Sequence, residues 1–147
     1  AVPDDHASLC LRALQARGLI SARRQSRWVH YFSSPDPLVP AAAHILAVVS
    51  RAILTEKWTT DRIIHNLTAY THPRRLTVLY CLLTKGNLAT PVLAQETHIS
   101  RQALARHLNK LSERKMIVDK DAVWSLHPDR SFFSETFLQL IARHADL

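Results

Sequence analysis

Apolar residues recur at helical spacing in one segment of the second half of the chain. Ala103, Leu104, Leu108 and Leu111 fall on one side of a helix. Ser100 precedes them and is a residue type that caps helix starts, because its hydroxyl accepts a hydrogen bond from an unpaired backbone N–H. The other side of the helix carries polar residues, namely Arg101, Gln102, Arg106, Asn109 and Lys110. The pattern therefore predicts an amphipathic helix with a basic, amide-bearing front.

The rest of the chain also predicts mainly α-helical structure, with only 2 glycines against 7 prolines. The predicted helices cover residues 4–17, 41–54, 61–70, 73–84, 90–97 and 131–145. Within residues 21–32 the pattern predicts a short strand, a basic turn and a second strand at Trp28–Phe32, and a short hairpin is predicted at Ile117–Leu126. Thr60 and Thr90 stand at capping positions, and Gly18 at a helix end.

Part of this pattern occurs twice. Leu11, Leu14, Leu19 and Ile20 match Leu108, Leu111, Met116 and Ile117. In each copy a hairpin and another helix follow. The second copy is complete, whereas the first lacks about three preceding helices and is expected to be truncated at its N-terminus. We therefore expect two domains, at residues 1–57 and 58–147, the first ending in a long connecting helix.

The composition and net charge of the chain indicate which classes of partner it could bind. The chain has 147 residues, 47% of them hydrophobic, which suffices for one ordinary domain or two small ones. Its net charge of +7 favours a polyanion, nucleic acid before an anionic membrane surface. No apolar run reaches the length of a membrane span and no signal peptide is visible, so a cytoplasmic protein without a membrane partner is expected.

Two segments resemble one family of regulators. Residues 11–32 resemble the recognition helix and wing of the ArsR/SmtB-type repressors, and residues 71–111 are similar to that family from its first core helix through its recognition helix. The resemblance implies two winged helix-turn-helix units, each a three-helix core with a small β-hairpin wing, and operator binding as a dimer. A tandem departs from the family's single unit, so either a homodimer or an intramolecular pseudo-dimer is expected.

Operator binding would fall mainly on the second copy, because the N-terminal end of a recognition helix enters the major groove. Gln pairs with adenine there, and Arg with guanine. The resemblance places His107 beside the backbone-contacting face, although a partly buried structural histidine is an equal alternative. The predicted contacts in this copy are Ser100, Arg101, Gln102, Arg106, His107 and Lys110.

The first copy contributes differently. Asp4 and Asp5 at its first helix would repel phosphate, whereas Arg23, Arg24 and Arg27 form a basic hairpin suited to phosphate or the minor groove. The alternative for the hairpin is a solvated tip.

Several other residues have two interpretations or a structural one. Arg74 and Arg75 suit either phosphate contact or a surface patch, and Arg114 is expected to cover the end of its helix. Trp58 and Tyr70 are expected to pack between the two halves.

Neither a metal site nor a cofactor is expected. The predicted helix at 90–97 lacks the cysteines that arsenic-type sensors carry there. The Asp/His/His/Glu set of metal sensors is not matched in spacing by His127, Asp129, Glu135 and His144. Cys10 and Cys81 form no CxxC pair and are expected in the core, which argues against a redox switch.

No nucleophile–base pair or Gly-rich phosphate loop is recognisable, so no enzyme is expected. The sequence therefore predicts a double-stranded DNA-binding transcriptional regulator, as a repressor. The alternative is a winged-helix interaction or dimerisation module without direct DNA readout, and the acidic start of the first helix favours it. A third interpretation is the dimerisation half of a methyltransferase. The absence of a recognisable nucleotide-binding segment argues against it.

Overall fold

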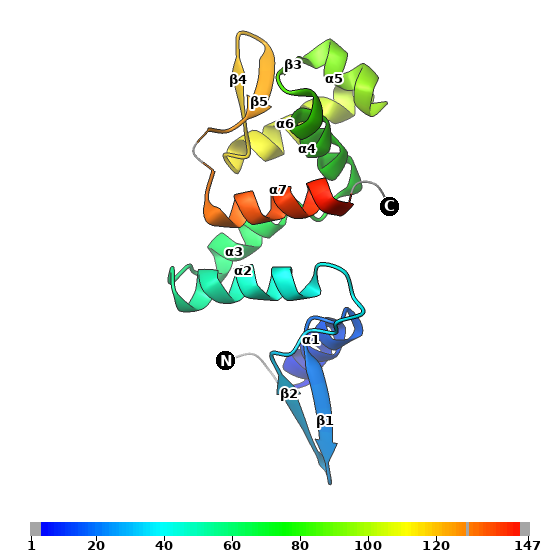
Figure 1. The fold of residues 1–147 in the computed structure, drawn as a ribbon, viewed down its shortest axis with the longest axis vertical. Coiled ribbons are helices and arrows are strands. Elements are labelled where there is room, and N and C mark those ends of the chain that lie inside the picture. The colour runs from blue at the N-terminus through cyan, green and yellow to red at the C-terminus, as the bar shows by residue number, and fades with distance from the viewer. Residues whose placement is uncertain (1–3, 129, 145–147) are drawn as a thin grey trace. The chain divides into compact units, whose positions relative to one another are not determined.

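The computed structural model describes residues 4–128 and 130–144 and is mixed α/β with helix predominant. Within those residues it has seven helices and two small antiparallel sheets (Figure 1), so the mainly α prediction is confirmed at this level. The chain divides into two compact units, Ala1–Thr55 and Glu56–Leu147. This boundary lies close to the one expected from the sequence, and the assignment of each unit as a winged helix stays a prediction.

Unit 1 is a helix, a hairpin and a second helix. Its elements are α1 (Asp4–Ala16), β1 (Ser21–Gln25), β2 (Trp28–Phe32) and α2 (Ala42–Leu54). The first strand of the hairpin pairs antiparallel with the second, from Ser21 opposite Phe32 to Gln25 opposite Trp28. A two-residue turn joins them, with φ of 57° at Ser26.

Gly18 ends α1 as predicted. Its N–H donates to the Gln15 carbonyl at 2.9 Å, and the N–H of Leu19 donates to the Leu14 carbonyl at 3.0 Å. These bonds form a Schellman motif, which needs a left-handed residue, and Gly18 has a φ of +68°. A Cβ at this position would also lie 2.5 Å from a methyl carbon of Val39.

The apolar face of α1 is open. Leu9 is 59% exposed and Leu14 is 39% exposed, and Cys10 beside them is exposed as well. The expectation that Cys10 is a core residue is therefore wrong, because the hairpin and α2 leave this side of the helix uncovered. Cys81, in contrast, is buried as expected.

Unit 2 interleaves five helices with a three-stranded sheet. Its elements are α3 (Thr60–Leu67), α4 (Pro73–Lys85), β3 (Leu88–Ala89), α5 (Thr90–Thr97), α6 (Arg101–Glu113), β4 (Ile117–Lys120), β5 (Val123–Leu126) and α7 (Phe132–His144). The strand order is β3-β5-β4, with Leu88 opposite Trp124 and Ile117 opposite Leu126. The strand β3 was not predicted, because a two-residue strand has no measurable alternation of apolar and polar residues.

The core of unit 2 lies between its helices and the sheet. The predicted stripe of α6 is confirmed, since Leu104, Leu108 and Leu111 are at most 2% exposed. They pack in one cluster whose other members include Val78, Leu79, Leu93, Met116, Ile117 and Leu138. Burial of such side chains is the main favourable term in folding, at about 1.5–3 kcal/mol each.

Aromatic rings extend this core. Trp58 packs on Phe133, with ring centroids 5.3 Å apart, and Tyr70 stacks on Phe137 at 4.4 Å. Both rings therefore contact the core of unit 2, and the expectation that they lie between the two halves stays a prediction.

Two of the predicted caps are displaced. Thr59, not Thr60, caps α3, and its hydroxyl accepts from the Arg62 N–H at 3.3 Å. The cap of α6 is the predicted one, because the Ser100 hydroxyl accepts from the Ala103 N–H at 3.4 Å.

Thr90 is the first residue of α5, and Ala89 before it is the N-cap without a side-chain bond. The Thr90 hydroxyl instead accepts from the indole Nε1 of Trp124 at 2.9 Å. The expected capping role of Thr90 is therefore wrong, since its hydroxyl joins α5 to β5.

In both copies of the sequence repeat, the helix before the hairpin ends in the same way: α1 in unit 1 and α6 in unit 2. Lys115 is left-handed, with φ of 53°, and the N–H of Met116 donates to the Leu111 carbonyl at 3.0 Å. Leu111 and Met116 are the residues that the repeat aligns with Leu14 and Leu19. In both units a hairpin and a helix follow, so the repeat is present in local backbone structure as well as in sequence.

The turn between β4 and β5 generates a prediction. Asp121 and Ala122 both have positive φ, 53° and 63°, which is the type I′ geometry that favours glycine at the second position. Ala122→Gly should therefore raise the free energy of unfolding by about 0.5–1 kcal/mol. In contrast, Ala105→Gly at an exposed position of helix α6 should lower it by about 1 kcal/mol. Urea unfolding followed by circular dichroism measures the free energy of unfolding of both variants and of the wild type. A lower value for Ala122→Gly than for the wild type would contradict the prediction.

Candidate nucleic-acid interface

The front of α6 presents most of the predicted contact residues together. Arg101, Gln102, Arg106 and Lys110 are all exposed, opposite the buried leucines. Ser100 is exposed too, but its hydroxyl holds the helix start. The front is therefore a row of cationic and amide groups on a helix whose other side is fixed in the core.

His107 extends this row toward the start of α4. It is half-buried, and its ring centroid lies 4.6 Å from that of His72. His72 is the N-cap of α4, where its Nδ1 accepts from the Arg74 N–H at 3.2 Å. Exposed Arg74 and Lys110 flank the pair, and we refer to His72, Arg74, His107 and Lys110 as the basic cluster. His107 thus has the packing of a structural histidine at the edge of the exposed front.

The basic cluster shifts the titration of its central histidine. Burial is the largest cause lowering the pKa of His107, followed by the positive charges of His72, Arg75, Arg74 and Lys110. Every charged group in that set repels a proton. The surrounding potential is positive, and such a potential attracts phosphate.

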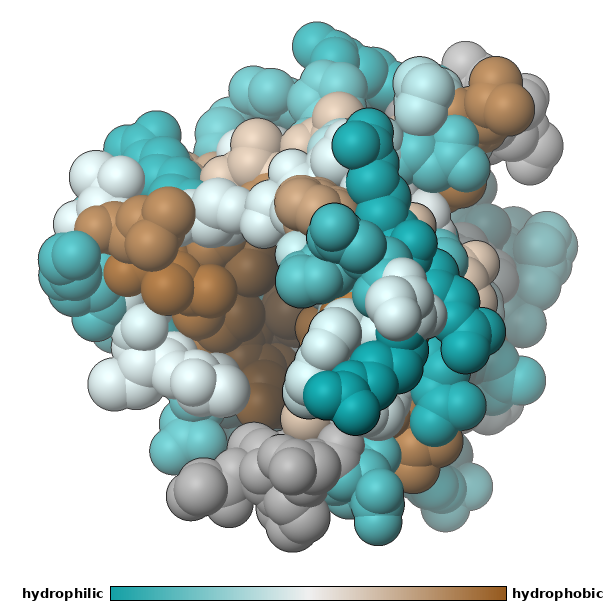
Figure 2. Space-filling model, turned by 90° about the horizontal axis from the view of Figure 1, so that it is seen from below, coloured by the Kyte–Doolittle hydropathy of each residue, from teal (hydrophilic) through white to brown (hydrophobic). Residues whose placement is uncertain are grey.

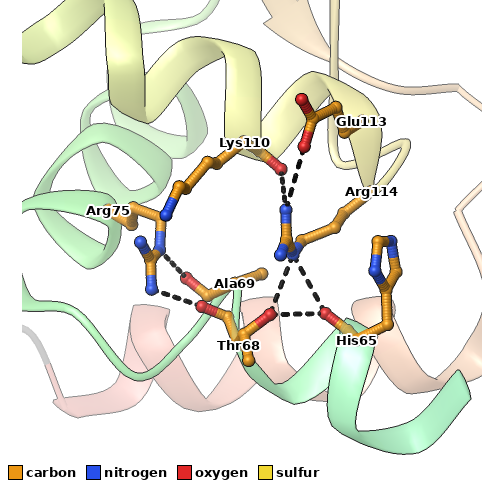
Figure 3. A network of polar contacts seen from close by, with 7 residues as sticks. All are labelled: His65, Thr68, Ala69, Arg75, Lys110, Glu113 and Arg114. Carbon is orange, nitrogen blue, oxygen red and sulfur yellow. Dashed lines mark hydrogen bonds and ion pairs between the residues drawn. The ribbon is translucent and has the colours of Figure 1, made fainter. Parts of the chain in front are cut away.

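Arg75 is not part of this surface. It is only 7% exposed, and its Nε donates to the Ala69 carbonyl at 3.1 Å while its Nη2 donates to the Thr68 carbonyl (Figure 3). These carbonyls follow the C-terminal end of α3, where orphan acceptors need partners. Both sequence interpretations of Arg75, phosphate contact and surface patch, are therefore wrong.

Arg114 holds the same helix end from the other side. Its Nε donates to the His65 carbonyl and to the Thr68 hydroxyl, both at 2.9 Å, and its Nη1 donates to the Lys110 carbonyl at 2.7 Å (Figure 3). Its side chain is 13% exposed, so Arg114 covers the end of its own helix, as expected, and also reaches the end of α3. The pair Arg75 and Arg114, here called the arginine clamp, ties α3 to α4 and α6.

In unit 1 the three predicted arginines lie on the hairpin. Arg23 and Arg24 are neighbours in β1, so their side chains point to opposite faces, and Arg27 lies in the turn. The Arg23 guanidinium lies 5.8 Å from the Phe32 ring centroid, and that of Arg27 lies 5.4 Å from the Trp28 ring. All three arginines are exposed, but they form no single patch.

Comparison with known proteins gives no family: no family model matches the chain, and searches of curated proteins and of solved structures found no significant match. Across residues 4–128 and 130–144, no group of three or more His, Cys, Asp or Glu side chains could hold a metal ion. In that part of the chain, no helix has the length and apolar character needed to cross a membrane.

Two features of the site could not be predicted from the sequence. His72 is 35 positions before His107, so nothing in the local pattern links them. The burial of Arg75 was equally hidden, because its acceptors are backbone carbonyls that carry no residue signature.

The arginine clamp can be tested against its exposed neighbour. Arg75→Met removes donors from buried carbonyls and should lower the free energy of unfolding by about 2 kcal/mol or more. Arg74→Met, one residue earlier and exposed, should change it by less than about 0.5 kcal/mol. Chemical unfolding of both variants measures this, and equal stabilities would show that the clamp contributes nothing.

The environment of His107 predicts a pH dependence of stability. Because its pKa in the folded state is below the ordinary value, the unfolded chain binds more protons near pH 6. The stability that neutral His107 contributes is therefore present above about pH 6.5 and falls as the pH is lowered. His107→Gln should flatten the decline in unfolding free energy between about pH 7.5 and pH 5. An unchanged slope in this variant would refute the assignment, and the exposed His98→Asn serves as control.

Proposed function

We propose that this protein is a sequence-specific double-stranded DNA-binding regulator of the winged helix-turn-helix class, with α6 as its recognition helix. The observation that carries the proposal is the exposed basic and amide front of α6, continued by the basic cluster at the start of α4. Side chains on such a helix reach base edges in the major groove, while flanking cations bind phosphate.

The arrangement of unit 2 supports the proposal. Its order α4-β3-α5-α6-β4-β5, with sheet order β3-β5-β4, is consistent with the order expected of a helix-turn-helix followed by a wing. The loop between α5 and α6 has only three residues, His98 to Ser100, with His98 left-handed at φ 53°. A short turn of this kind sets two helices at the angle that presents the second one to DNA.

The resemblance to ArsR/SmtB-type repressors supports repression as the mode of action. It also supports binding of DNA as a dimer. The repeated helix end and hairpin in both units support an intramolecular pseudo-dimer as the alternative to a homodimer. The resemblance rests on the motifs of residues 11–32 and 71–111 and includes no enzymatic activity or cofactor.

The second candidate function is a protein-interaction module, and one observation favours it. Unit 1 exposes Leu9 and Leu14 on α1, which a protein partner would cover. In that function the charge on α6 would be incidental, and binding would depend only weakly on salt.

Substitutions on α6 test the proposal. Arg101→Ala and Gln102→Ala should each weaken binding to a selected duplex by about 1–3 kcal/mol and reduce discrimination against other sequences. Arg23→Ala should weaken all duplexes about equally. Fluorescence anisotropy with selected and mixed-sequence duplexes measures both effects.

Salt dependence separates the two candidate functions. Phosphate contacts predict a steep loss of duplex affinity between about 50 and 200 mM salt. Unchanged duplex affinity in the Arg101 and Gln102 variants would overturn α6 as the reading element, and absence of duplex binding at low salt would favour the interaction module.

A further inference from the structure

The hairpin of unit 1 keeps large aromatic side chains in solvent. Trp28 is 63% exposed and Phe32 is 46% exposed, although burying such rings is strongly favourable. Figure 2 shows one face of the molecule, on which hydrophilic residues nearest the viewer lie beside a hydrophobic hollow. Arg23, Arg24 and Arg27 on the same hairpin are exposed as well, so the rings lie among charged side chains.

The strand register places both rings on one face of the hairpin. Residues directly opposite each other share a face, and alternate residues along a strand share it as well. Ser21 pairs with Phe32, Arg23 with His30, and Gln25 with Trp28. The side chains on this face, here called the aromatic face, are Ser21, Arg23, Gln25, Trp28, His30 and Phe32.

Each exposed ring has a guanidinium over it. Arg23 lies 5.8 Å from the Phe32 centroid and Arg27 lies 5.4 Å from the Trp28 centroid. A ring offers a stacking surface to a nucleobase, and an adjacent cation offers a partner to the phosphate that follows it. Two such ring-and-cation pairs on one ribbon suit two nucleotides of the same unpaired strand.

Charge determines which occupant fits. Between Asp5 and Asp36 the chain has five arginines and no acidic residue. A second copy of this hairpin docked face to face would bring like charges together, which is unfavourable. A polyanion with exposed π-faces satisfies both the charge and the rings.

We propose that the aromatic face binds single-stranded nucleic acid, with Trp28 and Phe32 as stacking platforms for bases. This binding is separate from duplex reading by α6, because it uses unit 1 and recognises unpaired bases. Sequence preference should be slight, since every base has a π-face.

The probe is a fluorescein-labelled oligothymidylate of roughly 20 nucleotides, longer than the site that one small domain covers. The full chain should bind it with steep salt dependence. Trp28→Ala and Phe32→Ala should each weaken binding on the order of tenfold. Trp28→Tyr should retain it, because the ring is kept.

Val29→Ala is the matched control. Val29 is 49% exposed on the other face of the same strand, so its truncation tests for general damage to the hairpin. Binding should change less than about twofold in this variant. Trp28→Phe should still bind but lose most of the fluorescence quenching that oligothymidylate causes in the wild type, which would identify Trp28 as the contacting ring.

The outcomes separate this proposal from the duplex proposal. Arg101→Ala should leave oligothymidylate binding unchanged. Trp28→Ala should leave unchanged the preference of α6 for the selected duplex over mixed-sequence duplexes. No oligothymidylate binding by the wild type, or equal binding by Trp28→Ala, would overturn the single-strand proposal. Self-association that Trp28→Ala abolishes, without any effect of oligothymidylate, would also overturn it in favour of an interface between copies.

Discussion

Unit 2 depends on the arginine clamp at the end of α3. A helix end leaves backbone carbonyls without partners, and burying them unpaired would cost about 1–3 kcal/mol each. Arg75 supplies donors from α4, and Arg114 supplies donors from the residue that follows α6. Because Arg114 also donates to the Lys110 carbonyl, α6 is fixed by polar contacts at its end as well as by its buried leucines. The exposed front of α6 is thus presented by a helix held both at its back and at its end.

Most helices of this fold could be predicted from sequence, because their signals are local. The spacing of Leu104, Leu108 and Leu111 predicted the buried side of α6, and Ser100 and Gly18 predicted where helices begin and end. Each of these signals depends on residues within about one or two helical turns.

Features that depend on distant residues could not be predicted in this way. The strand β3 exists because Leu88 and Ala89 pair with β5, more than 30 positions later. Thr90 looked like a cap, but the indole of Trp124 uses its hydroxyl. Of the candidate site, the exposed residues of α6 could be identified by periodicity, whereas the contact between His72 and His107 is tertiary.

The register of the unit 1 hairpin constrains how its sequence can change. Side chains alternate between faces with a period of two, so inserting or deleting one residue in β2 would send Trp28 and Phe32 to opposite sides of the ribbon. Changes of two residues would instead keep the rings together and alter only the reach of the hairpin. Related chains that keep the aromatic face should therefore vary in the length of β2 by even steps, whatever happens to individual residues along it.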